Sequence, residues 1–102
     1  MQIIKTLSKQ IKEELHDAEK YARDALAHKA DDPALAATYY RLANAEIEHA
    51  SMLHDDVVRE IEKAKSEKVV PPVMFDIWNW KHDELIEEEK EVRLLLEMYK
   101  SK

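Results

Sequence analysis

The sequence has no cysteine, and this absence narrows its chemistry before any motif is considered. Without thiols a chain forms no disulfide framework, no thiolate zinc site and no cysteine nucleophile, so any bound metal must accept oxygen and nitrogen ligands. Glycine is also absent, and only three prolines occur in 102 residues, which leaves few points where a helix is interrupted. The candidate metal ligands are therefore the carboxylates and the five histidines.

Long apolar runs and an excess of basic charge are missing as well. No stretch approaches the ~20 consecutive apolar residues of a membrane span, and Met1 to Ser8 lacks the apolar core and cleavage site of a signal peptide. The formal net charge is -6 and the isoelectric point is near 5.3, whereas nucleic acids and anionic membranes attract a basic surface. We therefore expect a cytoplasmic protein that binds neither nucleic acid nor membranes.

The residues that are present are typical of long helices. Asp, Glu, Lys and Arg make up 37% of the chain, and together with Ala and Leu they favour helices with charged outer faces. A chain of this length forms one domain with a modest core, which a partner chain would help to cover. The sequence thus predicts a single all-α domain over residues 1–102 and favours a homo-oligomer.

Aspartate and proline mark the ends of three predicted helices. Asp32 is a good N-cap and Pro33 suits the first helical position, while Pro71-Pro72 interrupts the chain again. The predicted helices are Ile3 to Lys29, Pro33 to Lys65 and Val73 to Tyr99. The short first connection makes the first two helices an antiparallel hairpin. The third helix either packs on this hairpin or swings onto another chain.

Two polar residues interrupt the apolar stripe of the second helix, which we expect to face the core. The stripe consists of Leu35, Tyr39, Leu42, Glu46, His49, Leu53, Val57, Ile61 and Ala64. Glu46 and His49 are three residues apart, so they project from the same face one turn apart. Burying a polar group without a partner costs roughly 2–7 kcal/mol. Either a metal ion or a buried polar pairing must compensate these two side chains.

Two further carboxylates lie at the depth of this pair. A helix rises ~1.5 Å per residue, so depth can be counted from the turns. Glu14 lies ~26 Å before the first turn, Glu46 and His49 lie ~20–24 Å after it, and Glu89 lies ~26 Å after the second turn. We therefore predict Glu14, Glu46, His49 and Glu89 as metal ligands. A solvated acidic face is the alternative interpretation of Glu89, which stands in a run of acids.

The remaining histidines are interpreted differently. His82 stands on the apolar stripe of the third helix, which indicates a hydrogen-bonded core or interface histidine. His54 and His16 are expected to be exposed. His28, near the end of the first helix, is expected to interact with the helix dipole.

Glu14 together with Glu46-Ile47-Glu48-His49 resembles one half of the ligand set of the ferritin-like helix-bundle proteins. That family places one Glu on each of two helices and a Glu-x-x-His on each of two others. Tyr21, seven residues after Glu14, matches a Tyr that ferritins and rubrerythrins often carry at this spacing, although its ring is also expected to pack at the seam. The resemblance covers Leu7 to about Ile61.

The third helix departs from the family pattern because Glu89 is followed by Val92, not His, at the relevant spacing. The chain is therefore similar to the encapsulated, half-length ferritin-like proteins, whose dimer assembles the four-helix site, and to small ferritin-like proteins of prophage regions. The resemblance implies a bundle core completed by a homodimer or higher oligomer. It also implies a divalent metal, Fe first with Mn or Zn as alternatives, and iron handling or Fe(II) oxidation with a site shared between subunits.

Two other functions stay open. One is a non-catalytic helical interaction module that keeps the fold without the chemistry. The other is a structural zinc or manganese site that holds a dimer together. The sequence contains no nucleophile motif, phosphate loop or redox cysteine pair that would support another class of enzyme.

Overall fold

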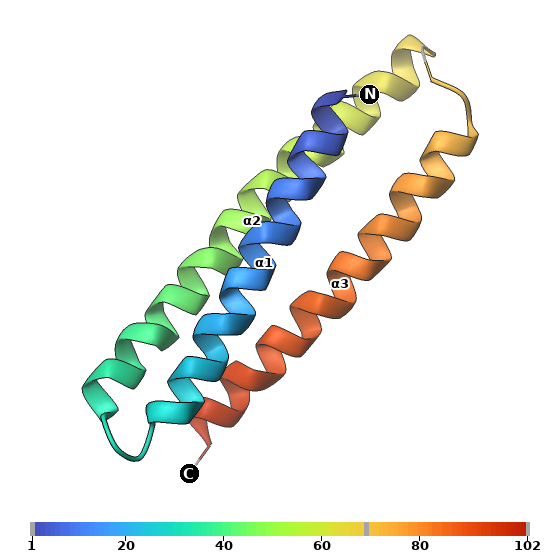
Figure 1. The fold of residues 1–102 in the computed structure, drawn as a ribbon. Coiled ribbons are helices and arrows are strands. Elements are labelled where there is room, and N and C mark those ends of the chain that lie inside the picture. The colour runs from blue at the N-terminus through green and yellow to red at the C-terminus, as the bar shows by residue number, and fades with distance from the viewer. Residues whose placement is uncertain (1, 69, 102) are drawn as a thin grey trace.

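The computed structural model describes residues 2–68 and 70–101, and it consists of three helices joined by two short connections (Figure 1). The helices are α1 (Gln2–His28), α2 (Pro33–Glu67) and α3 (Val73–Lys100). Their ends agree with the predicted ends to one or two residues, and the described residues contain no strand. The all-α prediction is confirmed.

Local signals set the ends of α2. Asp32 accepts a hydrogen bond at Oδ1 from the backbone N–H of Leu35, 3.1 Å away, and Pro33 is the first helical residue. At the other end Lys68 takes the left-handed conformation, with φ 55°, and its N–H donates to the carbonyl of Lys65. Glycine usually occupies this position at a helix end. Because the sequence has no glycine, a lysine takes it.

Helix α1 lies between the other two helices. It packs along both α2 and α3, whereas α3 comes close to α2 at only a few points (Figure 1). The molecule is accordingly elongated, with extents of 55 × 17 × 15 Å. The α1–α2 hairpin is the main packed unit, and α3 lies on one of its faces.

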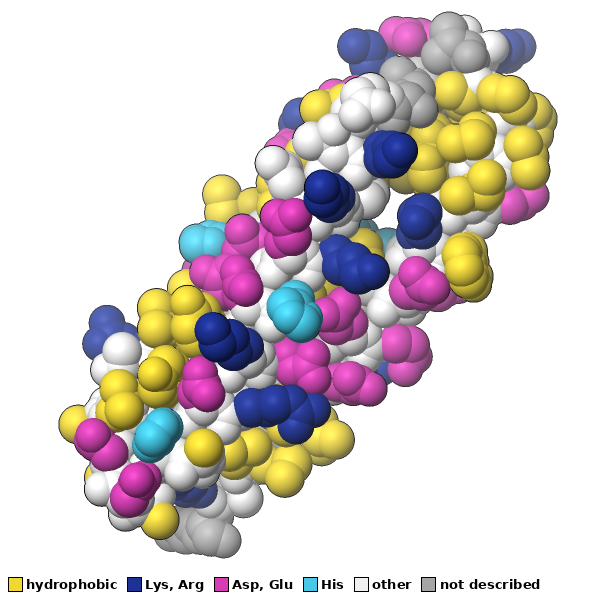
Figure 2. Space-filling model, in the orientation of Figure 1, with side chains coloured by type: hydrophobic (Ala, Val, Ile, Leu, Met, Phe, Trp, Pro, Cys, Tyr) yellow, Lys and Arg dark blue, Asp and Glu magenta, His cyan; other side chains and the backbone are white. Residues whose placement is uncertain are grey.

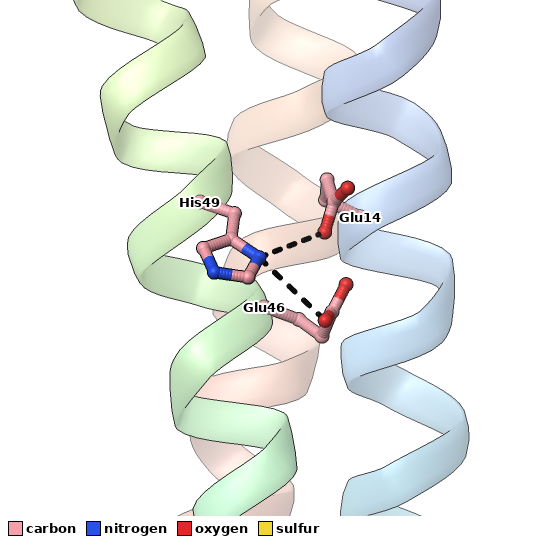
Figure 3. A group of neighbouring side chains, drawn as sticks. All are labelled: Glu14, Glu46 and His49. Carbon is pink, nitrogen blue, oxygen red and sulfur yellow. Dashed lines mark ion pairs between the residues drawn. The ribbon is translucent and has the colours of Figure 1, made fainter.

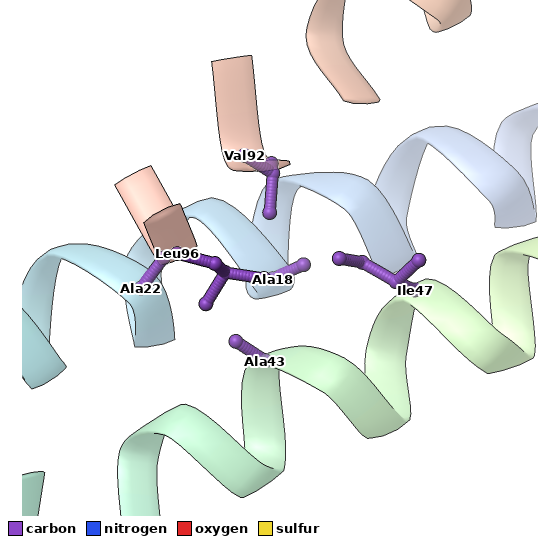
Figure 4. Close-up of a cluster of buried hydrophobic side chains, with 6 residues drawn as sticks. All are labelled: Ala18, Ala22, Ala43, Ile47, Val92 and Leu96. Carbon is purple, nitrogen blue, oxygen red and sulfur yellow. The ribbon is translucent and has the colours of Figure 1, made fainter. Parts of the chain in front are cut away.

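Small side chains make the contact between α1 and α2. Ala18 and Ala22 of α1 lie against Ala43 of α2, and all three are fully buried (Figure 4). Alanine lets two helices approach closely, while Val92 and Leu96 of α3 close the same cluster from the other side. Two further clusters continue the core toward the other end, one around Ile11, Leu15 and Ala50 and one around Ile4, Ala64 and Trp78.

The stripe predicted to face the core on α2 does so only in part. Ala64 is fully buried, and Leu53, Val57 and Ile61 pack half-buried against the core, whereas the prediction is wrong at Leu42 and His49. Leu42 is 39% exposed and the side chain of His49 is 54% exposed. The buried residues of α2 are Ala36, Ala43, Ile47, Ala50 and Ala64. The alanines face α1 because they allow the closer approach. As a result, the larger apolar side chain of Leu42 is left at the edge of the α1–α2 contact.

The surface carries many large apolar side chains among its charges. Figure 2 shows hydrophobic side chains gathered at the end of α3 next to the α2–α3 connection, with acidic and basic side chains spread over the rest of this face. The exposed large apolar residues are Ile3, Leu42, Met52, Val58, Val73, Ile77, Trp80, Ile86, Leu94 and Met98. Within residues 2–68 and 70–101, no helix combines the length and apolar character that crossing a membrane requires.

Candidate metal site

Three of the four predicted ligands meet on one face of the α1–α2 hairpin. Glu14 comes from α1, and Glu46 and His49 come from α2 (Figure 3). The Nδ1 atom of His49 lies 3.4 Å from Oε2 of Glu14 and 3.6 Å from Oε1 of Glu46. One oxygen or nitrogen of each residue lies within 4.8 Å of the other two. We call these three residues the carboxylate–histidine group.

The group is open on one side. In Figure 3, α3 passes behind the hairpin, while the three side chains lie toward the viewer. The side chains of Glu14 and Glu46 are 29% and 19% exposed, and that of His49 is 54% exposed. The carboxylates are thus mostly covered and the imidazole stands at the entrance. A solvated metal ion can reach all three.

One oxygen of the group has no hydrogen-bond donor. Oε2 of Glu14 is buried and makes no hydrogen bond with any described residue. The Nδ1 atom of His49, at 3.4 Å, is close to it without forming a hydrogen bond. Leaving a buried charged acceptor unsatisfied is unfavourable by about 1–3 kcal/mol or more. A cation between the two carboxylates would satisfy this oxygen.

The two carboxyl groups affect each other's protonation. A side-chain hydrogen bond with Glu14, followed by burial and the negative charge of Glu14, raises the pKa of Glu46 from its usual 4.5 to about 7. Positive charge on His49 works in the opposite direction. Two carboxyls can share a hydrogen bond only when one holds a proton. A cation that binds between the two carboxyl groups would therefore displace a proton that they share.

The structure does not bring Glu89 to this group. Glu89 lies on α3, where it pairs with Arg93 at 3.4 Å and lines a hollow of about 390 Å³ together with His54 and His82. The same hollow is lined by core residues of α1 and α2, so it opens on the α3 side of the hairpin. The count along the helices gave the right depth for Glu89. The hairpin itself separates Glu89 from Glu14.

The structure also settles the surroundings of two other histidines. The Nε2 atoms of His54 and His82 lie 3.0 Å apart, within hydrogen-bond distance. The prediction that His82 is hydrogen-bonded is confirmed. His54, predicted to be exposed, is only partly exposed, because His82 of α3 lies against it. Tyr21 packs on Tyr39, with ring centroids 6.1 Å apart, as expected for an aromatic residue at a seam.

A second cluster of possible ligands was missed by the sequence analysis. His16 and Glu19 of α1 and Glu88 of α3 bring one ligand atom each within 4.8 Å of one another. The His16–Glu19 spacing of three residues is the signal that could have revealed it. Burial, with the negative charge of Glu19, raises the pKa of Glu88, whereas His16 and Lys12 lower it.

Basic side chains distinguish this second cluster from the carboxylate–histidine group. Arg23 pairs with Glu19 at 3.0 Å, and Lys12 lies near enough to Glu88 to act on its pKa. The protein's own cations thus offset part of the acidic charge. By contrast, the described residues place no Lys or Arg within ion-pair distance of Glu14 or Glu46. The carboxylate–histidine group is therefore the stronger candidate for a metal.

Comparison of the chain with models of protein families, with curated proteins and with solved structures found no significant match.

Proposed function

We propose that this protein binds a divalent metal ion through Glu14, Glu46 and His49. The observation that carries the proposal is the buried Oε2 of Glu14, which lacks a hydrogen-bond donor and lies beside a second carboxylate and an imidazole. Carboxylate oxygens and a neutral imidazole suit Fe(II), Mn(II) and Zn(II). Iron is our first choice, because the residue pattern resembles that of the ferritin-like proteins.

The residues have distinct parts in this proposal. Glu14 and Glu46 supply the negative charge that holds the cation, and they release their shared proton as it binds. His49 fixes one side of the site and, at 54% exposure, stands where the ion enters. Bound iron would supply electron transfer to oxygen or peroxide, so Fe(II) oxidation or iron handling in the cytoplasm is the activity to test.

A second chain would complete the site. The carboxylate–histidine group supplies three ligands from one face of the hairpin, and α3 lies on the other face. Leu42, one turn before Glu46 on α2, is 39% exposed. A homodimer that packs two such faces together would cover Leu42 and bring two sets of ligands together. We therefore propose at least a dimer, with a site shared between subunits.

Metal analysis tests the proposal directly. Protein purified without added metal is examined by elemental analysis and then titrated with Fe(II), without oxygen, and with Mn(II) and Zn(II). We expect Glu14→Ala, Glu46→Ala and His49→Ala to lower metal affinity by at least ~10-fold, since loss of an outer-shell partner alone has effects of ~10–100-fold. Glu13→Ala and Glu48→Ala remove exposed neighbours of the ligands and are the matched controls. Wild-type protein that takes up no metal would refute the proposal.

A helical interaction module is the second candidate, and the start of α3 favours it. Val73 and Trp80 are 58% and 64% exposed, and Ile77 is 40% exposed. Exposed apolar side chains that gather in one region mark surfaces that bind other proteins. Metal-free protein that still forms an oligomer would support this module.

A further inference from the structure

Besides the apolar clusters that α2 and α3 share, three contacts between polar or aromatic side chains join the two helices. Near one end Tyr40 stacks on Tyr99, with ring centroids 4.7 Å apart. Near the other end the ammonium of Lys65 lies over the ring of Phe75. The backbones of the two helices are close at only a few positions, so α3 contacts α2 mainly through side chains. The central point is the contact between His54 of α2 and His82 of α3.

The two imidazoles of this contact, which we call the histidine pair, face each other through their Nε2 edges. Their ring centroids are 5.0 Å apart, whereas their Nε2 atoms are only 3.0 Å apart. The nitrogens are thus much closer than the ring centres, so neither ring covers the face of the other. The angle between the two ring planes is 28°, so the rings are nearly parallel. Each Nε2 therefore points to the same small region between α2 and α3.

This separation is close to that of two ligands on one metal ion. Two imidazole nitrogens that lie 2.0–2.1 Å from a tetrahedral zinc ion are about 3.3 Å apart. The pair at 3.0 Å reaches this separation by small rotations of the side chains, with the backbones of α2 and α3 in place. A hydrogen bond between two neutral imidazoles uses one donor and one acceptor. A metal ion instead binds the Nε2 lone pairs of both imidazoles.

The surroundings leave room for an ion and for its other ligands. His54 is half-buried and His82 is exposed, and both line the hollow of about 390 Å³ next to Glu89 and Ser51. Both histidines also line a second hollow of about 200 Å³. Solvent thus reaches the two nitrogens, and water would supply the other ligands, because no described Asp, Glu or further His forms a ligand group with this pair. Borderline ions that favour imidazole, such as zinc, nickel and copper(II), fit such a site.

We propose that His54 and His82 form a second metal site, for an imidazole-preferring divalent ion such as zinc, which fastens α3 to α2. The site lies on the α3 side of the hairpin and shares no residue with the carboxylate–histidine group. It does not depend on the proposed iron site. Its effect is to add a link between α3 and α2, whose backbones come close at only a few positions.

Thermal unfolding with added zinc tests the proposal separately from the carboxylate–histidine group. His49→Ala is used as the background, because it disables the carboxylate–histidine group. In this background we expect zinc at about 100-fold above its Kd to raise the melting temperature by about 10 °C. His54→Gln or His82→Gln should remove this increase. His28→Gln, which replaces a histidine at the end of α1, is the matched control and should keep it.

Glutamine separates a metal ligand from a hydrogen-bond partner. Its amide can still donate to or accept from the remaining histidine, so the melting temperature without zinc should change little. NMR of wild-type protein gives a second measurement that needs no variant. Zinc should shift the imidazole signals of His54 and His82 and leave that of His28 in place. The proposal is wrong if zinc leaves the His54 and His82 signals unchanged. It is also wrong if zinc stabilises both Gln variants as strongly as their background.

The two metal proposals can fail separately. If His49→Ala loses iron while the zinc effect on the histidine pair persists, both are supported. If the zinc effect persists and wild-type protein binds no iron, only the proposed function fails. If iron binds and zinc has no effect on His54 or His82, only the second site fails.

Discussion

His49 Nδ1 lies 3.4 Å from Glu14 Oε2, although the two residues belong to different helices. The contact exists because a short connection fixes α1 and α2 as antiparallel neighbours and so sets which of their turns are level. Glu46, one turn before His49, adds its carboxylate at 3.6 Å. Two carboxylates and one imidazole therefore meet without a basic residue between them. This arrangement leads to three predictions, and a fourth concerns the α1–α2 contact.

The stability of the metal-free protein should fall as the pH rises through the range 4.5–7. The pKa of Glu46 is raised from 4.5 to about 7 in the folded protein, mainly by its hydrogen bond with Glu14. In this range the folded state holds a proton that the unfolded state has released, so raising the pH favours unfolding. Partial exposure weakens the effect, and we expect a decrease in melting temperature on the order of 5 °C.

Thermal melts at closely spaced pH values measure this dependence. Glu46→Gln, which imitates the protonated carboxyl, should remove it, and Glu48→Gln, at an exposed neighbour, should not. A bound metal should reverse the sign, because both carboxylates are then ionised and protons compete with the metal. A melting temperature that rises with pH in metal-free protein would contradict the prediction.

Glu14→Gln should stabilise the metal-free protein and weaken its metal binding. The buried Oε2 of Glu14 has no donor, while the Gln amide can donate to Glu46 and carries no charge. At a pH well above 7, where the carboxyl pair has lost its shared proton, relief of the repulsion and the added hydrogen bond should contribute about 1 kcal/mol to the free energy of unfolding. Urea unfolding in the presence of EDTA measures this gain. Glu13→Gln is the control, and a less stable Glu14→Gln variant would indicate that Glu14 has a structural partner.

The helix ends and the meeting of Glu14 with Glu46 and His49 could be predicted because both depend on local signals. Asp32 and Pro33 start α2 through groups next to them in sequence. The short turn before them then sets the register of the hairpin. Depth along two helices that share such a turn is a matter of counting residues, and the count was correct.

The position of Glu89 could not be predicted in this way, since counting gives depth but not the side on which a helix packs. Helix α3 lies on the face of the hairpin opposite the carboxylate–histidine group (Figure 3). The next residue in sequence, Glu88, is the one that approaches α1, where it meets His16 and Glu19. One residue corresponds to about 100° around a helix. The pattern of apolar residues on α3 was too broad to fix its orientation to that degree.

The predicted burial of Leu42 on α2 was wrong for a related reason. The apolar pattern predicted a core stripe that includes Leu42, but Ala43 is fully buried and Leu42 is 39% exposed. Hydrophobicity favours the larger side chain, whereas close approach of two helices favours the smaller one. The stability of the α1–α2 contact should therefore depend on alanine.

Ala43→Leu should destabilise the protein by about 1–3 kcal/mol. Ala43 is fully buried between Ala18 and Ala22, so added methyl groups force the helices apart. Ala37→Leu is the matched control, because Ala37 is exposed on the same helix and substitutions there usually change stability by less than about 0.5 kcal/mol. Urea unfolding of both variants measures the difference. Equal stability of the two would show that α1 and α2 are not tightly packed at Ala43.

The open face of the hairpin should be the dimer interface. If the proposed shared site is correct, light scattering in the presence of metal should give about twice the 12.0 kDa mass of one chain. Leu42→Lys should raise the dissociation constant of the dimer by at least ~10-fold, because it places a charge on this face one turn from Glu46. Leu94→Lys, at a 62% exposed position on α3, is the control and should leave the dimer intact.

The two variants identify which face binds the second chain. If Leu94→Lys dissociates the dimer while Leu42→Lys does not, the interface lies on α3, and each carboxylate–histidine group must hold its metal without the partner. If wild-type protein with metal gives the mass of one chain at micromolar concentration, the shared site is ruled out. Loss of both the dimer and tight metal binding in Leu42→Lys, with Leu94→Lys unchanged in both, is the result expected when the two chains supply ligands to the same ion.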